Sequence, residues 1–266
     1  MKKKVEEVEK EEKVEKAELD NPETVDEDEE EGFDYFEIFG EEEEIDEDAI
    51  DTEIPADMFV VEKKPVYSFF KRVIDILVSL PVVIILFIPS AIFSLVIYLD
   101  SPGASPIFVQ KRVGKLGKKF KFYKFRTMIP DAEKKKKALE AQNEMKNNKA
   151  FKMKNDPRLT RIGKKIRKYS IDELPQFLNV LKGDMSIVGP RPPLVKEVMN
   201  YTDEHKIRLA IKPGLTCYWQ VQHERNKIDF DKWVELDSDY IKERSFKTDL
   251  KIFFKTFKAI FGAEGM

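Results

Sequence analysis

The longest apolar stretch of the chain runs from Ile76 to Leu99, 24 residues without a charged side chain. A helix of this length is sufficient to cross a hydrocarbon core about 30 Å thick. Pro81 and Pro89 lie inside the stretch. Because each proline lacks an N–H group and its ring clashes with the preceding turn, the helix is expected to kink or break there. The pattern therefore predicts a membrane segment that is not a straight spanning helix.

Charged residues on both sides of this stretch bear on its orientation. Lys71 and Arg72 precede it, and a second basic group follows it: Lys111, Arg112, Lys115, Lys118 and Lys119. Since basic residues favour the cytoplasmic side, this distribution suits a segment with both ends in the cytoplasm. A hairpin that is broken at Pro89-Ser90 and re-enters the same leaflet satisfies both observations, and a kinked spanning helix is the alternative. Asp75 is expected to pair with Arg72 or Lys71 on the same helix.

Three further segments have recognisable patterns. Residues 107–128 alternate between hydrophobic and basic side chains, as strands do, and Gly114 and Gly117 mark turns, so a basic hairpin or an extended segment is predicted. Residues 131–147 are rich in lysine and predict a solvated helix. Residues 250–261 place apolar side chains on one helical face and most lysines on the other. Such a helix is suited to lie in a membrane interface, and packing against the protein's own core fits the pattern equally well.

The distribution of charge divides the chain into two parts. The whole chain has 47 Lys and Arg against 50 Asp and Glu, a net charge of −3. Residues 1–64 contain 8 basic and 28 acidic residues, a net charge of −20, whereas residues 65–266 have a net charge of +17. This asymmetry excludes one uniform globular domain. Low hydrophobicity predicts a disordered acidic tail, interrupted by an aromatic cluster at 33–39.

The counts of cysteine and histidine exclude several kinds of site. Cys217 is the single cysteine, and His205 and His223 are the two histidines. One cysteine excludes an intrachain disulfide and a multi-cysteine metal site, and two histidines are too few for a histidine-rich one. Interleaved aromatic and basic residues also occur in nucleic-acid binders. The uncharged run favours lipid headgroups or a phosphorylated substrate as partners instead.

Residues 155–193 contain the densest candidate chemistry. A basic run ends near Ser170, which is positioned to cap a helix, with Glu173 completing a capping box and Gly183 ending the helix. Asp172 and Glu173 then lie at a helix N-terminus, where the dipole attracts anions. They either complement that dipole or act as a carboxylate nucleophile or metal ligand. A rigid turn, residues 189–193, presents Arg191, whose planar fork suits phosphate oxygens.

These elements resemble the signature of the bacterial sugar transferases, monotopic phosphoglycosyl transferases that start polysaccharide and glycan assembly. The resemblance extends from residue 71 to about residue 261 and leaves out the acidic tail. It is carried by KRVID at 71–75, the proline-broken apolar run, QKRVGKLGKKFKFYKFRTM at 110–128, DPRLTRIGKKIRKYSIDELPQFLNVLKGDMSIVGPRP at 156–192, PGLTCYWQV at 213–221 and WVELDSDYI at 233–241. One departure, HERN at 223–226 in place of a Ser-Gly-Arg-Asn-like run, bears on sugar specificity.

The resemblance implies a specific reaction. Such enzymes transfer sugar-1-phosphate from a UDP-sugar to undecaprenyl phosphate, release UMP, and so initiate exopolysaccharide, capsule or glycoconjugate synthesis. Asp172 would be the nucleophile that forms a phospho-aspartyl intermediate, and Glu173 would orient the acceptor or handle its proton. Mg²⁺, with Asp172 as a ligand, would shield the diphosphate charge. The residues expected to bind phosphate or nucleotide are Arg167, Arg191, Pro190, Pro192, Lys124 and Arg126.

The expected fold is mixed α/β, mostly helical with short strands, on a re-entrant membrane hairpin and interfacial amphipathic helices. Three parts are predicted: an acidic tail at 1–64, a re-entrant segment at 65–100 and a cytoplasmic catalytic domain at 101–266. The expected location is the inner leaflet of the cytoplasmic membrane, with no nucleic-acid partner. Self-association or contact with downstream glycosyltransferases is an open expectation. The alternative function is a non-enzymatic membrane-surface scaffold whose acidic tail recruits partners.

Overall fold

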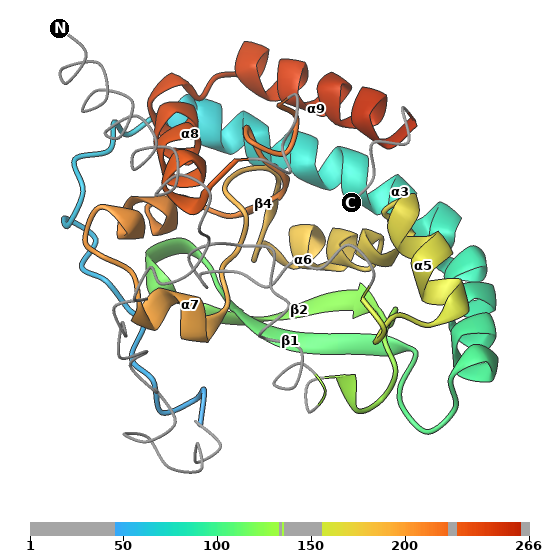
Figure 1. The fold of residues 1–266 in the computed structure, drawn as a ribbon. Coiled ribbons are helices and arrows are strands. Elements are labelled where there is room, and N and C mark those ends of the chain that lie inside the picture. The colour runs from blue at the N-terminus through green and yellow to red at the C-terminus, as the bar shows by residue number, and fades with distance from the viewer. Residues whose placement is uncertain (1–45, 133–134, 136–155, 223–227, 262–266) are drawn as a thin grey trace, which may run out of the picture. The chain divides into compact units, whose positions relative to one another are not determined.

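The structure is a computed structural model that describes residues 46–132, 135, 156–222 and 228–261 (Figure 1). The predicted disordered tail up to residue 45, its aromatic cluster, most of the lysine-rich segment at 131–147 and the 223–226 departure lie outside these residues. Residues 46–64 belong to the same compact unit as the rest of the described chain. The reason is that residues 46–64 contain isoleucine and threonine side chains that contact the folded body, which their acidic composition does not reveal.

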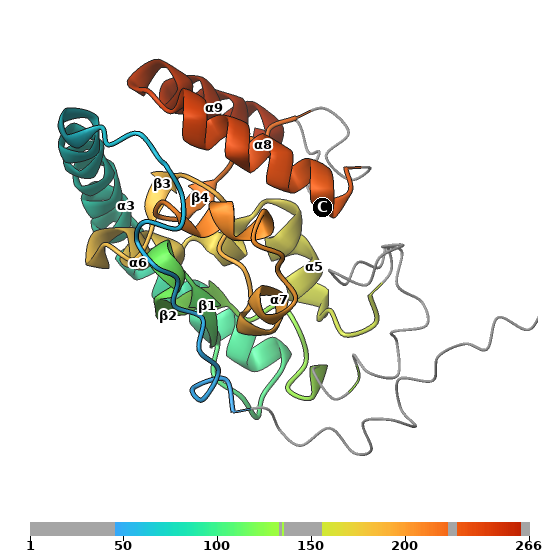
Figure 2. The same ribbon diagram turned by 90° about the vertical axis from the view of Figure 1, so that its left-hand side faces the viewer.

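Helices surround two small sheets in the described part of the chain (Figures 1 and 2). The elements, in order, are α3 (Pro65–Asp100), β1 (Ile107–Val113), η1 (Lys115–Gly117), β2 (Lys119–Phe125), α5 (Arg161–Lys168), η3 (Ile171–Glu173), α6 (Gln176–Lys182), β3 (Ser186–Val188), α7 (Val195–Met199), η4 (His205–Leu209), β4 (Gly214–Thr216), α8 (Phe230–Glu243) and α9 (Phe246–Phe261). This composition confirms the prediction of helices with short strands.

The apolar stretch forms one continuous helix, α3, with Pro81 and Pro89 inside it. The helix is therefore not interrupted at Pro89-Ser90, and the predicted re-entrant hairpin stays a prediction. Each proline removes one N–H, and the surrounding i→i−4 hydrogen bonds continue the helix around it. The axis changes direction along its length (Figure 1), as proline bends produce. The helix is long and apolar enough to cross a membrane. Only 6% of its most apolar 18-residue stretch is buried in the protein.

Both ends of α3 nevertheless pack on the same folded body. Near its start, Asp75 accepts hydrogen bonds from Ser186 Oγ at 3.1 Å and from the Ile187 amide at 3.0 Å. Near its end, Ile97 is buried, and Asp100 Oδ2 accepts from the Ile162 amide at 3.2 Å. The middle of the helix is left exposed, because the body covers only its two ends.

The partners of Asp75 differ from those predicted. The guanidinium of Arg72 donates instead to the carbonyls of Val180 and Leu181, the second at 2.7 Å, near the end of α6. Lys71 pairs with Asp249 at 2.6 Å. Local helical spacing therefore does not decide these contacts, because α6, β3 and α9 offer closer partners once the body has packed on α3.

The two sheets are both two-stranded. β1 and β2 pair antiparallel through the turn that contains Gly117, as predicted for the basic hairpin. β3 pairs parallel with β4. The two strands continue into a close approach at Gly189 and Gly214, where a Cβ added to Gly214 would lie 2.1 Å from the Gly189 nitrogen. Glycine is required there because no side chain fits between the two backbones.

The amphipathic C-terminal helix, α9, lies beside the first half of α3 (Figures 1 and 2). The rings of Tyr67 and Phe246 are 5.2 Å apart, and Ile252 is fully buried in the core. Three apolar side chains of α9 remain exposed: Leu250, Phe254 and Phe257. The sequence pattern allowed core packing or membrane contact, and the helix divides its apolar residues between the core and the surface.

Candidate active site

The two candidate carboxylates lie in the short helix η3, directly before α6. Ser170 has a left-handed backbone with φ 54° and caps no amide with its side chain. The predicted capping box is therefore wrong: the Glu173 amide donates to the Ser170 carbonyl at 3.1 Å, and its carboxylate contacts Lys124 instead. The sharp turn at Ser170 ends the basic helix α5 and separates it from the carboxylates. Gly183 ends α6 in the left-handed region, as predicted.

Lys124 on β2 lies between the two carboxylates. Its Nζ is 3.3 Å from Glu173 Oε1 and 3.8 Å from Asp172 Oδ2. Asn179 of α6 fixes this arrangement, because its side chain accepts from the Tyr123 amide at 3.2 Å and donates to the Lys121 carbonyl at 2.6 Å. These two bonds align the outer edge of β2 with α6. A buried amide therefore determines that the lysine of one element meets the carboxylates of another.

Burial controls the protonation of Asp172, which is 4% exposed. Loss of hydration raises the pKa of this carboxyl above its ordinary value, and the nearby charge of Lys124 lowers it in part. Glu173 adds to the rise because it is a second negative charge, and Arg167 opposes it. Glu173 itself is more exposed, with 27% of its side-chain surface accessible. Two adjacent carboxylates thus have different environments, a feature typical of sites where they have different tasks.

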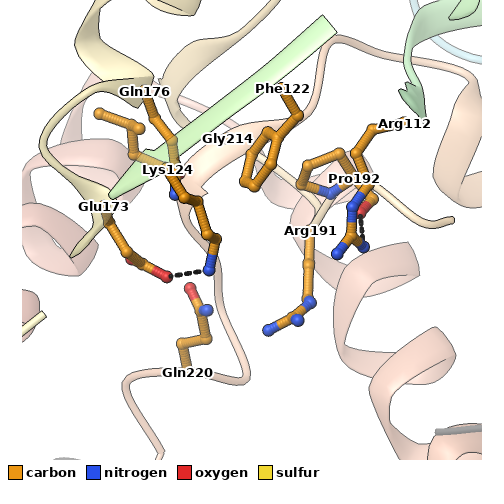
Figure 3. Close-up of a pocket in the computed structure, with 10 residues that line it drawn as sticks. Arg112, Phe122, Lys124, Glu173, Gln176, Arg191, Pro192, Gly214 and Gln220 are labelled. Carbon is orange, nitrogen blue, oxygen red and sulfur yellow. Dashed lines mark hydrogen bonds and ion pairs between the residues drawn. The ribbon is translucent and has the colours of Figure 1, made fainter. Parts of the chain in front are cut away.

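Two arginines line the opposite side of the same small cavity (Figure 3). Arg112 is 8% exposed, and its Nη1 donates to the Pro192 carbonyl at 3.0 Å. Its other bond, at 3.0 Å, goes to the amide oxygen of Gln110, so neither contact neutralises its charge. Burial and the neighbouring charge of Arg191 lower the pKa of Arg112 to about 10. In the described part of the chain neither guanidinium group forms an ion pair with a carboxylate, so the two provide a binding site for an anion.

Backbone and amide groups complete the wall of the cavity. Gly214, Leu215 and Gln220 come from β4 and the loop that follows it. Gln176, at the start of α6, is 2% exposed and lines the cavity, and its Nε2 has no hydrogen-bond partner in the described part of the chain. A buried donor without a partner is unfavourable in the free protein. It is consistent with a group that hydrogen bonds to a bound ligand.

Comparison with protein families shows which family the chain resembles. The family model for "Bacterial sugar transferase" matches residues 66–263, which include α3, the cavity and α9. The chain belongs to the bacterial sugar transferase family. The matched region excludes the acidic N-terminal residues, in agreement with the extent of the motifs.

The chain is similar in sequence to several known proteins. It is 52% identical over 170 residues to "Galactosyl transferase CpsE" of Streptococcus agalactiae serotype III (strain NEM316), covering 64% of this chain and 37% of the relative. It is 43% identical to "Undecaprenyl-phosphate galactose phosphotransferase" of Salmonella typhimurium, covering 74% of this chain and 41% of the relative. It is 37% identical to "Exopolysaccharide production protein ExoY" of Rhizobium meliloti, and the match covers 74% of this chain and 88% of the relative. The chain thus spans about two fifths of the first two relatives.

The structure brings most of the predicted site residues of the sugar transferase together. Asp172 and Glu173 contact Lys124, and Arg191 and Pro192 line the same cavity. Three other predicted residues do not line the cavity: Arg126, Pro190 and Arg167. The geometry therefore joins residues that are 67 positions apart in the chain, from Lys124 to Arg191.

Arg126 and Pro190 do not line the cavity. Arg126 is 6% exposed and donates to the Ser101 carbonyl at the end of α3, because it lies beyond the end of β2 at Phe125. The Pro190 carbonyl accepts from the Gly214 amide at 2.9 Å, which makes it part of the strand pairing. Arg167 influences Asp172 electrostatically without lining the cavity. The structure thus places Arg126 and Pro190 away from this cavity, and their role in phosphate or nucleotide binding stays a prediction.

Four important residues were missed by sequence reasoning. Arg112 and Gln220 were inside quoted motifs, but nothing in their spacing distinguished them from neighbouring polar residues. Gln176 follows Pro175 in the same motif as the carboxylates, and its position on the first turn of α6 was a usable signal. Asn179 positions the hairpin by accepting a hydrogen bond from the Tyr123 amide. The two residues are 56 positions apart, so no local pattern indicates this contact.

Proposed function

We propose that this sugar transferase moves a sugar-1-phosphate from a UDP-sugar to undecaprenyl phosphate and releases UMP. The observation that carries the proposal is a buried carboxylate, Asp172, whose Oδ2 lies 3.8 Å from Lys124 Nζ, while Lys124 itself lines a cavity opposite an arginine pair. The names of two relatives support the same substrate classes. One is an undecaprenyl-phosphate galactose phosphotransferase, and the other is an exopolysaccharide production protein. The product would begin an exopolysaccharide, capsule or glycoconjugate.

The chemical step assigns different tasks to the two carboxylates. A carboxylate oxygen of Asp172 attacks the phosphorus that bears the sugar, and the bond from that phosphorus to the UMP oxygen breaks with its electron pair leaving on UMP. A phosphate oxygen of the lipid acceptor then attacks the phospho-aspartyl phosphorus and releases Asp172. Glu173, which is more exposed, is placed to orient the acceptor or to take its proton. Burial of Asp172 supports this division, because a desolvated carboxylate is a stronger nucleophile once it is ionised.

The two sides of the cavity fit the two phosphates of the donor. The sugar-bearing phosphate would lie near Lys124 and Asp172, and the phosphate that leaves with uridine would lie near Arg112 and Arg191. The arginine pair stabilises the negative charge that develops on the leaving group. Gln176 Nε2, a buried donor that lines the cavity, would hydrogen bond to an oxygen of the transferred group.

Mg²⁺ fits the donor set of the site. Among the described residues, no group of three or more His, Cys, Asp or Glu side chains could hold a metal ion. Magnesium is commonly held by one or two carboxylates together with substrate phosphates, which matches Asp172 and Glu173 beside a diphosphate. Bound there, the ion would neutralise charge on the diphosphate so that an anionic nucleophile can approach.

A re-entrant arrangement of α3 in the inner leaflet follows from the packing of its ends. Asp75 near one end and Asp100 at the other both contact the folded body, which supports a placement of both ends on one side of the membrane. Basic flanks favour the cytoplasm as that side. The bent, exposed middle of α3 and the exposed apolar residues of α9 would enter the leaflet, bringing the lipid phosphate to the cavity.

The test is an assay of lipid-linked product. The full chain is incubated with radiolabelled UDP-galactose, Mg²⁺ and undecaprenyl phosphate, and the organic phase is counted, followed by a panel of other UDP-sugars. Label that enters the lipid in the wild-type protein and not in Asp172→Asn supports the proposal, as does a trapped acid-labile phosphoprotein. Absence of transfer from every donor would favour the alternative of a membrane-surface scaffold that recruits partners through its acidic tail.

A further inference from the structure

An acidic strap, residues 46–54, lies along the turn between β1 and β2 (the blue segment of Figure 2). Thr52 is 5% exposed, and its Oγ1 donates to the Gly117 carbonyl at 2.6 Å. The Ile54 amide donates to the Leu116 carbonyl at 3.2 Å. A Cβ added to Gly117 would lie 1.8 Å from the Thr52 oxygen. The absence of a side chain at Gly117 therefore provides the space in which the strap binds.

Charge also joins the strap to the hairpin. The Lys119 ammonium donates to the carbonyls of Glu47 at 2.7 Å and Asp48 at 3.0 Å, and Lys111 forms an ion pair with the Asp48 carboxylate. These contacts are exposed, and ion pairs of this kind are weak and screened by salt. A cavity lined by residues 48–53, Gly117 and Lys119 lies beside them. The strap is thus held by a small number of separable contacts.

The apolar side chains of the strap connect it to the arginine side of the active site. Ile50 and Ile54 pack against the core cluster that contains Val113 and Val195. The Val113 amide donates to the Pro193 carbonyl at 3.0 Å, so this cluster lies directly behind the turn at 190–193 that carries Arg191. Val113 also follows Arg112 in β1. The strap therefore supports, from behind, both elements that place guanidinium groups in the cavity.

Electrostatics acts in the same direction. Burial and the charge of Arg191 lower the pKa of Arg112, and the negative charge of Glu47 in the strap opposes that shift. The strap thus favours the charged guanidinium through Glu47 as well as supporting the strand through Ile50 and Ile54. Neither effect requires the strap to touch the ligand.

We propose that the acidic strap is a detachable brace for the arginine side of the active site. Docked, it holds β1 against the turn at 190–193 and keeps Arg112 and Arg191 in the cavity; released, it leaves this side loose and donor binding weakens. The proposal rests on the proposed function only in assigning these arginines to the donor's phosphates. The bracing itself is a property of the fold and is measured separately.

The experiment uses the full chain with Ile50→Ser and Ile54→Ser together. The matched control is Val60→Ser, because Val60 is a fully exposed apolar residue that follows the strap in the chain. Amide hydrogen exchange is followed at Val113, Arg191 and Leu194, because the prolines at 190, 192 and 193 have no amide hydrogen, and the affinity for uridine diphosphate is measured by calorimetry. We expect exchange to accelerate and the affinity to fall by about 3- to 30-fold in the double variant, with no change in the control.

A peptide supplied in trans completes the test. A synthetic peptide of residues 46–57 is expected to restore both slow exchange and affinity to the double variant, and the same peptide with serine at positions 50 and 54 is not. Unchanged exchange at Val113 in the double variant, or tighter nucleotide binding in it, would overturn the proposal. If uridine diphosphate binds neither protein, the proposed function fails, and the exchange measurement still decides whether the strap braces this side.

Discussion

Two clusters of buried charge in this protein differ in how completely their charges are paired. Arg208 donates to Asp237 Oδ2 at 2.7 Å and to the Tyr201 hydroxyl at 2.8 Å, and the two ionic side chains are 3% and 1% exposed. In the active site, the hydrogen bonds of Arg112 within the described residues go to neutral oxygens, and Lys124 is 3.8 Å from the carboxylate of the proposed nucleophile. One cluster is a matched pair that joins η4 to α8; the other leaves positive charge available to a ligand.

This difference teaches what each cluster does. A matched buried pair is weak evidence for net stability, but removing one partner leaves a charge without compensation. An unmatched cluster already carries that penalty in the free protein, and a substitution there relieves it while removing function. The two clusters should therefore respond in opposite directions to charge removal, and the following predictions test this contrast in order of decreasing effect.

Asp172→Asn should have the largest effect on activity, a loss on the order of 10³-fold or more in transfer to lipid. Because burial raises the pKa of Asp172 in the folded state, ionisation of this group destabilises the fold as pH rises through that pKa. Removing the charge should therefore raise the melting temperature at neutral pH, by about 2–4 °C per kcal/mol relieved. Asp203→Asn, at an exposed carboxylate, is the control for both measurements. Retained transfer activity would refute the assignment of the nucleophile.

Arg208→Met should have the largest effect on stability. It leaves Asp237 charged and buried without its partner, which costs about 3–5 kcal/mol and lowers the melting temperature by about 6–20 °C. The matched control is Lys232→Met, which breaks an exposed pair with Glu235 and should change stability by about 0.5 kcal/mol or less. Scanning calorimetry decides the matter, and equal melting temperatures for the two variants would contradict the contrast between the clusters.

Arg112→Lys should weaken donor binding more than it affects folding. Lysine keeps the charge but loses the planar fork that contacts Pro192 and faces the cavity. Charge-assisted hydrogen bonds of this kind are worth roughly 1.5–3 kcal/mol, so kcat/KM for the donor should fall about 10- to 100-fold. Arg161→Lys, where the side chain is 96% exposed, should have no such effect. A kcat/KM equal to that of the wild type would remove Arg112 from the binding site.

Lys124→Met should lower activity, because Lys124 contacts both carboxylates, and the smallest effect expected in this series is the change in pH dependence of the activity that remains. The charge of Lys124 lowers the pKa of Asp172, which burial otherwise raises. Without the lysine, the carboxyl remains protonated to a higher pH, so the acidic limb of the kcat/KM profile of the residual activity should move upward. Lys196→Met, at an exposed lysine outside the cavity, is the comparison. An acidic limb that stays in place or moves downward would contradict the coupling of the two groups.

Much of the local structure was predictable from the sequence. Period and composition indicated the apolar helix α3, the hairpin β1–β2, the amphipathic helix α9 and the end of α6 at Gly183. These features depend on steric and hydropathic preferences of residues close in the chain, which a sequence displays directly. The pair Asp172 and Glu173 was identified in the same way, from a short motif at a helix start.

The sequence by itself thus determined the elements, the charge asymmetry and the carboxylate pair. Only the tertiary structure decided which basic residue meets that pair, Lys124 rather than Arg126, and that Asp75 bonds to β3 rather than to its helix neighbours. It also decided that an acidic segment, residues 46–54, packs on the body. These outcomes join residues separated by 48 to 112 positions. The physical reason is that such contacts depend on how whole elements pack, and a buried group takes whichever partner that packing brings within hydrogen-bond distance.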